Sequence, residues 1–189
     1  MIEKSQNQNC LAGKCVILGI SGSIAAYKSA DLAGELRKAG AEVFVVMTDS
    51  AKRFITPLTL ATISRNPVSS SLWEEANGWL PEHIDLADRA DLLLVAPATA
   101  NQLANFASGT CSDLLSSVYL ATNAPTLMAP AMNGKMFEHK ATTRNLEILE
   151  ARGVSIIPPE TGELACGYLG SGKMASIDEI INKTFSILS

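Results

Sequence analysis

Short apolar runs alternate with amphipathic stretches along this 189-residue chain, and this alternation limits its fold more than any other feature. The first run, residues 14–20, contains several β-branched residues, which predicts a buried strand. A turn of small residues leads into a predicted helix over 24–39, which ends before Gly40, and a second strand is predicted over 42–47. Two strands joined through a helix form a right-handed βαβ unit, so the strands are expected to be parallel.

The alternation continues to the end of the chain. Further helices are predicted over 49–64, 99–108, 112–120, 136–151 and 177–188, further strands over 91–96, 126–129 and 154–157, and a loop over 68–82. The sequence thus predicts a polar tail, residues 1–12, and one domain, residues 13–189. We expect an α/β fold with a doubly wound, mostly parallel sheet and helices on both faces, a flavodoxin-like or Rossmann-like three-layer sandwich.

The composition argues against several functional classes. With 47% hydrophobic and 18% charged residues, the chain can bury a core, and its net charge of −4 argues against a nucleic-acid partner. No apolar run approaches the roughly 18 residues of a membrane span, and the polar N-terminus lacks a signal segment. The four cysteines form no CxxC pair, so we expect neither disulfides nor a metal site. We therefore expect a cytoplasmic protein without a membrane or nucleic-acid partner.

The turn after the first strand is a candidate anion site. Gly22 lets the backbone approach a ligand closely, Ser21 and Ser23 add hydroxyl groups, and the following helix offers free N–H groups. The GxGxxG pattern of dinucleotide sites is absent. After the second strand, Thr48 is suited to donate to a phosphate, whereas Asp49 is suited to hold a ribose. The alternative is a tight turn that simply requires small residues.

Two predicted strands end at a proline that is followed by small residues and an asparagine. The first of these ends carries Pro97, Ala98, Thr99, Ala100 and Asn101, and the second carries Pro130, Ala131, Met132, Asn133 and Met136. Small side chains leave room for a flat ring, and an asparagine amide can orient polar groups. Strand termination followed by helix capping would also explain each segment. Because the carboxyl ends of parallel strands form the ligand-binding edge of such sheets, we expect both segments to line one site.

A histidine and a cysteine are candidates for proton transfer. His83 lies upstream of the 91–96 strand, and Cys166 lies in a segment in which four of the thirteen glycines fall between Gly162 and Gly172. Such a segment predicts a mobile loop, near 160–176, that closes over a ligand, with Lys173 available to an anionic group. The alternatives are a structural or exposed histidine and a surface loop with an incidental thiol.

Together these motifs resemble one family, the homo-oligomeric flavin-containing cysteine decarboxylases, and within it the enzymes of coenzyme A synthesis. The resemblance extends from about Gly13 to the C-terminus. It implies a domain that binds FMN at a subunit interface, in a homotrimer or an assembly of trimers such as a dodecamer. It also implies FMN-dependent decarboxylation of 4′-phospho-N-pantothenoylcysteine to 4′-phosphopantetheine and CO2. Many bacterial relatives carry a second, synthetase domain, and because this chain ends at Ser189 we expect a separate synthetase chain.

The resemblance also implies roles for individual residues. His83 matches the active-site base, Cys166 the acid, and Asn133 the asparagine that holds the substrate carboxylate. Substrate contacts would further involve Phe54, Met136, Ala165 and Lys173, the last standing where relatives often have arginine. FMN contacts would involve Gly22, Ser23, Ile24, Thr48, Pro97, Ala98, Thr99, Ala100 and Ala131.

Four alternatives remain at this point. A peptidyl-cysteine decarboxylase of peptide-antibiotic maturation shares the flavin, histidine and asparagine chemistry but stops at the oxidised enethiol, and Cys166 favours the complete, redox-neutral cycle. A non-catalytic FMN-binding regulatory subunit would not need His83, Asn133 and Cys166 together. A flavin prenyltransferase would not need the asparagine and cysteine, and an NAD-binding module would need the missing glycine pattern.

Overall fold

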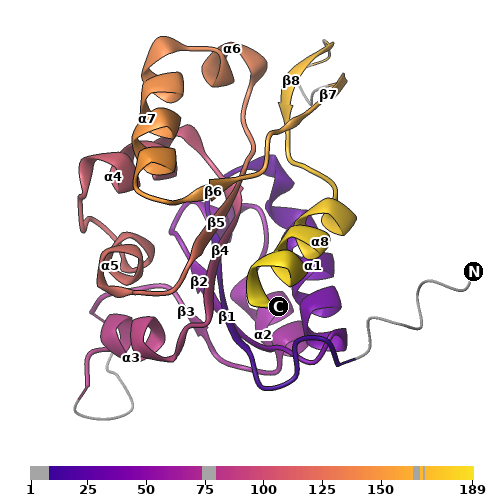
Figure 1. The fold of residues 1–189 in the computed structure, drawn as a ribbon, viewed down its shortest axis with the longest axis vertical. Coiled ribbons are helices and arrows are strands. Elements are labelled where there is room, and N and C mark those ends of the chain that lie inside the picture. Colours follow the sequence, from indigo (N-terminus) through magenta and orange to yellow (C-terminus); the bar gives the residue numbers. More distant parts are fainter. Residues whose placement is uncertain (1–8, 74–79, 164–166, 168) are drawn as a thin grey trace, which may run out of the picture.

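The computed structural model describes residues 9–73, 80–163, 167 and 169–189, and it shows three layers with a sheet in the middle (Figure 1). The strands are β1 (Cys15–Ile20), β2 (Glu42–Met47), β3 (Val68–Ser69), β4 (Leu92–Ala98), β5 (Thr126–Pro130), β6 (Ser155–Ile156), β7 (Glu160–Glu163) and β8 (Leu169–Lys173). The α-helices are α1 (Lys28–Lys38), α2 (Pro57–Ser64), α3 (Glu82–Arg89), α4 (Ala100–Ser108), α5 (Leu114–Ala121), α6 (Gly134–Phe137), α7 (Lys140–Ala151) and α8 (Ile177–Leu188). Two 3-10 turns, η2 (Ile24–Tyr27) and η3 (Ala51–Arg53), follow β1 and β2.

The main sheet has the order β3-β2-β1-β4-β5-β6, and all of its strand pairs are parallel. The chain builds outward from β1 to β2 and β3, and then crosses to β4 on the other side of β1. The strand order therefore reverses between β1 and β4, and open α/β sheets bind their ligands at the carboxyl end of such a reversal. The predicted fold class, a doubly wound parallel sheet covered on both faces, is confirmed.

The two faces of the sheet are buried under separate groups of helices. Leu32, Leu36 and Ile180 belong to the core under α1, α2 and α8. Leu103 and Phe106 belong to the core under α3, α4, α5 and α7. Every residue of β1 and β4 is buried, which explains why these strands are continuous apolar runs in the sequence.

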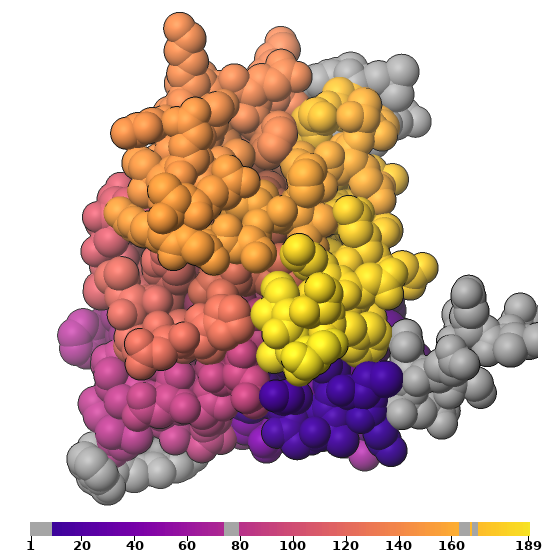
Figure 2. All heavy atoms as spheres, viewed as in Figure 1, coloured from indigo at the N-terminus to yellow at the C-terminus, as the bar shows by residue number. Residues whose placement is uncertain are grey.

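Both ends of the described chain contribute to the first of these cores. Leu11, within the predicted tail, is buried, and its N–H donates to the Ala39 carbonyl at 2.8 Å. In the space-filling view α8 lies against the N-terminal part of the chain (Figure 2). Within the described residues, no helix is long and apolar enough to cross a membrane.

Several predicted element boundaries were wrong. The helix predicted over 49–64 is the turn η3 followed by α2, which begins at Pro57. The helix predicted from residue 24 begins with the separate turn η2, and the predicted loop 68–82 contains β3 and the first residue of α3. The helix predicted over 136–151 is two helices, and the His139 side chain caps the second by accepting from the Ala141 N–H. Strand β4 continues through Pro97 to Ala98, because its pairing with β5 shifts register there and accommodates a residue without an N–H.

The segment predicted as a loop near 160–176 is also more regular than expected. Strands β7 and β8 pair in an antiparallel hairpin, which projects beside α6 (Figure 1). The glycine-rich sequence does not prevent pairing here, because the pairing is formed by backbone hydrogen bonds. Ala165 and Cys166 lie outside the described residues.

Cys15 has an acidic and buried environment. Its N–H donates to a carboxylate oxygen of Asp91 at 2.8 Å. Burial, followed by the negative charge of Glu42, raises the pKa of the Cys15 thiol to about 11, although Arg89 opposes the shift. A thiol reacts through its thiolate, so this cysteine should be inert at neutral pH.

We predict that iodoacetamide at pH 8 labels Cys10 and Cys111, which are exposed, and spares Cys15 in the folded protein. Because the raised pKa keeps the Cys15 thiol protonated, labelling should begin only as the pH approaches 11 or after unfolding. Peptide mass mapping measures the modification at each site. Labelling of Cys15 at the same rate as Cys10 at pH 8 would contradict the expected protection.

Candidate functional site

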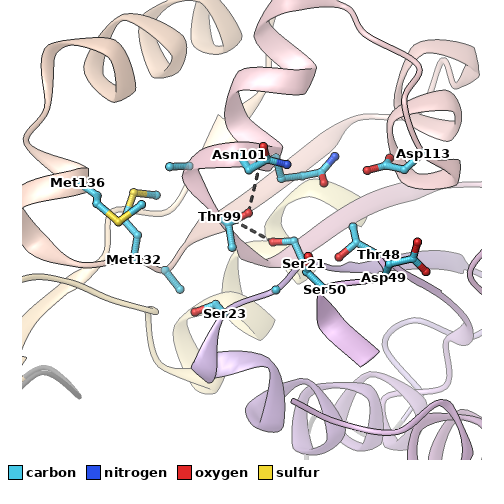
Figure 3. Close-up of a pocket in the computed structure, with 14 residues that line it drawn as sticks. Ser21, Ser23, Thr48, Asp49, Ser50, Thr99, Asn101, Asp113, Met132 and Met136 are labelled. Atoms are coloured by element: carbon cyan, nitrogen blue, oxygen red, sulfur yellow. Dashed lines mark hydrogen bonds between the residues drawn. The ribbon is translucent and has the colours of Figure 1, made fainter. Parts of the chain in front are cut away.

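A cavity of about 450 Å3 lies at the carboxyl ends of β1 and β4 (Figure 3). Ser21 and Thr99 meet near its centre, Met132 and Met136 lie at one end, and Asp49 and Asp113 lie toward the other. Its lining comprises Ser21, Gly22, Ser23, Thr48, Asp49, Ser50, Thr99, Ala100, Asn101, Gln102, Asp113, Ala131, Met132 and Met136. The volume is typical of small-molecule sites, and the position is the one expected from the strand order.

Ser21 joins the ends of the two central strands. Its hydroxyl donates to the Pro97 carbonyl at 2.8 Å and accepts from the Thr99 N–H at 2.9 Å, and its own N–H also donates to Pro97. The Ser29 hydroxyl adds a donor to the Ala96 carbonyl at 2.8 Å. Both serines are buried, so these bonds are protected from water and hold the floor of the cavity together.

Gly22 brings the first turn against the end of β2. A Cβ added to Gly22 would lie 2.3 Å from the Ser50 Cβ, a separation that real Cβ atoms do not reach. Only glycine fits at this turn, because the side chain of any other residue would overlap Ser50. Ser23, Thr48 and Ser50 line the cavity beside this turn, and their hydroxyls are suited to donate hydrogen bonds to an anion.

The opposite wall is formed by the beginnings of α4 and α5. Thr99 caps α4 by accepting from the Gln102 N–H, and Asp113 caps α5 by accepting from the Ser116 N–H at 2.7 Å. The buried Gln102 amide donates to the Ser116 hydroxyl at 3.2 Å, which ties the two helices together. This network fixes the polar wall before any ligand binds.

The two carboxylates of the cavity already have partners. Asp113 accepts the capping bond, and Asp49 forms an ion pair of 2.7 Å with Lys52. The hydrogen bond from Lys52 lowers the pKa of Asp49 below its usual value. Lys52 therefore offsets the negative charge of Asp49, whereas the capping bond stabilises the Asp113 carboxylate without removing its charge.

The hairpin β7–β8 holds the loop that carries Asn133. The Met132 N–H donates to the Gly172 carbonyl at 3.0 Å, and Asn133 caps α6 by accepting from the Lys135 N–H at 2.9 Å. Gly172 has φ +148°, and a Cβ there would lie 2.2 Å from the Met132 carbonyl oxygen. The loop and the hairpin are therefore in backbone contact.

His83 does not line this cavity. It lies on α3 and lines a separate depression of about 470 Å3, together with Ile84, Cys111 and Leu120. Trp73, also in this lining, is 91% exposed. One copy of the chain therefore keeps His83, the predicted base, and Asn133, the residue predicted to bind the carboxylate, on separate surfaces. The surface around His83 is apolar and exposed in the single chain.

The other predicted site residues are divided in the same way. Gly22, Ser23, Thr48, Thr99, Ala100, Ala131 and Met136 line the main cavity. Pro97 and Ala98 are buried in β4, Ile24 and Phe54 are exposed outside the cavity, and Lys173 forms an ion pair of 3.4 Å with Glu160. Ala165 and Cys166 are not among the described residues.

Three lining residues lie outside the segments predicted to form the site: Ser50, Gln102 and Asp113. Ser50 follows a strand end that was already singled out, and Asp113 has the sequence signal of a helix cap. Neither signal shows that the side chain lines the cavity. For Ser50 this depends on the contact between the first turn and the end of β2, and for Asp113 it depends on how α5 packs beside α4.

Comparison with known proteins assigns the chain to a family. The Flavoprotein family matches residues 4–189. This chain belongs to the Flavoprotein family. It is 52% identical over 164 residues to a coenzyme A biosynthesis bifunctional protein, CoaBC, of Vibrio vulnificus, covering 87% of this chain and 41% of that protein. The chain thus spans about two fifths of the length of these bifunctional relatives.

Other similarities extend over whole proteins. The chain is 48% identical over 172 residues to a probable phosphopantothenoylcysteine decarboxylase of Streptococcus mutans, covering 90% of this chain and 96% of that protein. Its fold matches a mutant PPC decarboxylase complexed with pantothenoylaminoethenethiol, with TM-score 0.81, 34% identity and coverage of 90% and 96%. It also matches the FMN binding protein AtHal3, with TM-score 0.78, 35% identity and coverage of 90% and 94%.

We predict that Gly172→Ala separates the hairpin from the Asn133 loop, whereas Gly162→Ala in the same hairpin does not. A Cβ at Gly162 would meet only the Lys173 side chain, at 3.8 Å. Gly172→Ala should cost about 1–3 kcal/mol and lower the Tm by several degrees. Hydrogen exchange at the Met132 amide should accelerate in this variant alone. Equal protection of that amide in both variants would show that the contact does not hold the loop.

Proposed function

We propose that this protein catalyses the FMN-dependent decarboxylation of 4′-phospho-N-pantothenoylcysteine to 4′-phosphopantetheine and CO2, a step of coenzyme A synthesis. The observation that carries this proposal is the 48% identity to the Streptococcus mutans protein over 96% of that protein's length. Because the match covers nearly all of that relative, it supports assigning the decarboxylase activity to this domain. The substrate is a cysteine amide, so an amide-forming ligase must supply it, and we propose that a separate synthetase chain does so.

The main cavity suits FMN in shape and in chemistry. The Gly22 turn, with the Ser23, Thr48 and Ser50 hydroxyls, offers donors for the phosphate and ribityl groups. Ala131 and the methionine end offer apolar surface for a flat ring. Lys52 pairs with Asp49, which reduces the repulsion between that carboxylate and the phosphate.

Bound FMN supplies reversible two-electron oxidation of the substrate carbon that bears sulfur, which creates the electron sink needed for loss of CO2. The protein positions the reacting cysteine. Asn133, held by the α6 cap and by the hairpin, would orient the substrate carboxylate. His83 would accept a proton, and Cys166 would donate one to the decarboxylated product.

His83 and Asn133 lie on different surfaces of one copy, so we propose that the active site forms between copies. The apolar surface of Trp73, Leu120 and Ile84 around His83 would be covered in the assembly. A homotrimer, alone or grouped into larger assemblies, closes such a head-to-tail contact and repeats the site at each interface. The exposed thiols of Cys10 and Cys111 are suited to the reducing cytoplasm, where we propose that the enzyme acts.

Incubation of the FMN-loaded protein with 4′-phospho-N-pantothenoylcysteine should give a product lighter by CO2 alone, since the cycle returns its electrons to the product. Mass spectrometry of the small-molecule fraction measures this change. A product that has also lost two hydrogens would instead identify an oxidative decarboxylase of the peptidyl-cysteine type. No turnover by protein that carries FMN would favour a non-catalytic flavin-binding role.

Co-expression of His83→Asn and Asn133→Ala copies should restore activity that neither variant has alone. In a randomly mixed trimer about a quarter of the sites combine an intact Asn133 with an intact His83 from the neighbouring copy. Purification through two different affinity tags isolates the mixed assemblies for assay. If they remain as inactive as the single variants, the two residues do not act in one site formed between copies.

A further inference from the structure

A second cavity, of about 420 Å3, adjoins the proposed FMN cavity. It is lined by Ala100, Lys135, Met136, His139 and Thr142. Ala100 and Met136 line both cavities, so the two meet at these side chains. A ligand in the main cavity can therefore extend past Ala100 and Met136 into the second cavity.

The second cavity combines apolar surface with two side chains that can donate hydrogen bonds to a ligand, those of Lys135 and His139. Thr142 is already engaged, because its hydroxyl donates to the Met136 carbonyl at 2.6 Å and fixes the turn between α6 and α7. The His139 Nδ1 accepts from the Ala141 N–H at 3.1 Å, which leaves Nε2 as the protonated nitrogen that can donate to a ligand. Lys135 also lines the cavity and contributes an ammonium group.

Lys135 differs from the other lysines near the site. Lys52 is paired with Asp49 and Lys173 with Glu160, whereas Lys135 forms no ion pair with any acidic side chain of the described residues. The surrounding segment, residues 135–144, carries three cationic side chains and one acidic side chain in a protein of net charge −4. This combination favours an anionic ligand.

We propose that the second cavity binds the phosphorylated pantoyl end of the substrate; this inference rests on the proposed decarboxylase function. In that substrate the carbon that carries the two methyl groups is bonded directly to the carbon that carries the phosphate. The methyl groups would contact Ala100 and Met136, and the phosphate would accept hydrogen bonds from Lys135 and His139. Contacts this far from the reacting carboxylate help to hold the cysteine against the flavin.

The test compares 4′-phospho-N-pantothenoylcysteine with N-pantothenoylcysteine, which lacks the phosphate. In Lys135→Gln, kcat/KM for the phosphorylated substrate should fall about ten-fold or more, while kcat/KM for the other substrate stays unchanged. His139→Asn should cause a smaller loss of the same kind, because asparagine preserves the helix cap. Lys140→Gln is the matched control, because it removes the same charge outside the cavity lining.

Equal losses in Lys135→Gln and Lys140→Gln, or a loss for both substrates alike, would overturn the phosphate site. Weaker FMN binding in Lys135→Gln would also overturn it, since the lysine would then serve the cofactor. If the wild-type protein turns over neither substrate, the decarboxylase assignment fails. The phosphate site is then tested separately, by comparing the affinities of the protein for 4′-phosphopantetheine and for pantetheine. A phosphate preference that depends on Lys135 supports the site, and its absence overturns it.

Discussion

The buried bonds of Ser21 are the constraint on which the site depends. Parallel strands bind one another along their length, but their carboxyl ends open toward solvent, and a ligand cavity there needs a floor that does not shift. Ser21 provides it by joining the end of β1 to Pro97 and Thr99 at the end of β4. Because the same hydroxyl both donates and accepts, the first turn and the beginning of α4 are fixed relative to each other before a ligand arrives.

Two glycines extend this fixed geometry through backbone contact. Gly22 allows the first turn to reach Ser50, and Gly172 allows β8 to reach the loop at Met132. The two contacts lie at different parts of the site, one at the proposed phosphate end of the cofactor and one beside Asn133. The cavity is therefore bordered by segments that are far apart in the sequence and that any larger side chain would separate.

The proposed chemistry is divided between surfaces that a single copy keeps apart. The hydroxyl-rich cavity and Asn133 lie at the carboxyl edge of the sheet, whereas His83 lies among apolar side chains on the outer side of α3 and α5. The uncovered apolar surface around His83, the proposed base, is explained if a second copy covers it. Activity would then depend on assembly of the copies. The contact between copies would also exclude water from the reacting cysteine of the substrate.

The sequence by itself determined the parallel α/β fold, because the continuous apolar runs of β1 and β4 can be satisfied only by a sheet buried on both faces. It also determined the glycine turn and the two strand ends that carry Thr99, Ala131 and Met136, since small residues and caps leave local signals. The continuation of β4 through Pro97 and the pairing of the glycine-rich hairpin were missed, because register shifts and strand partners are set by distant segments. Only the tertiary structure placed Gln102 and Asp113 on the cavity wall and His83 on a separate face, because those positions depend on how α3, α4 and α5 pack against the sheet and not on any local pattern.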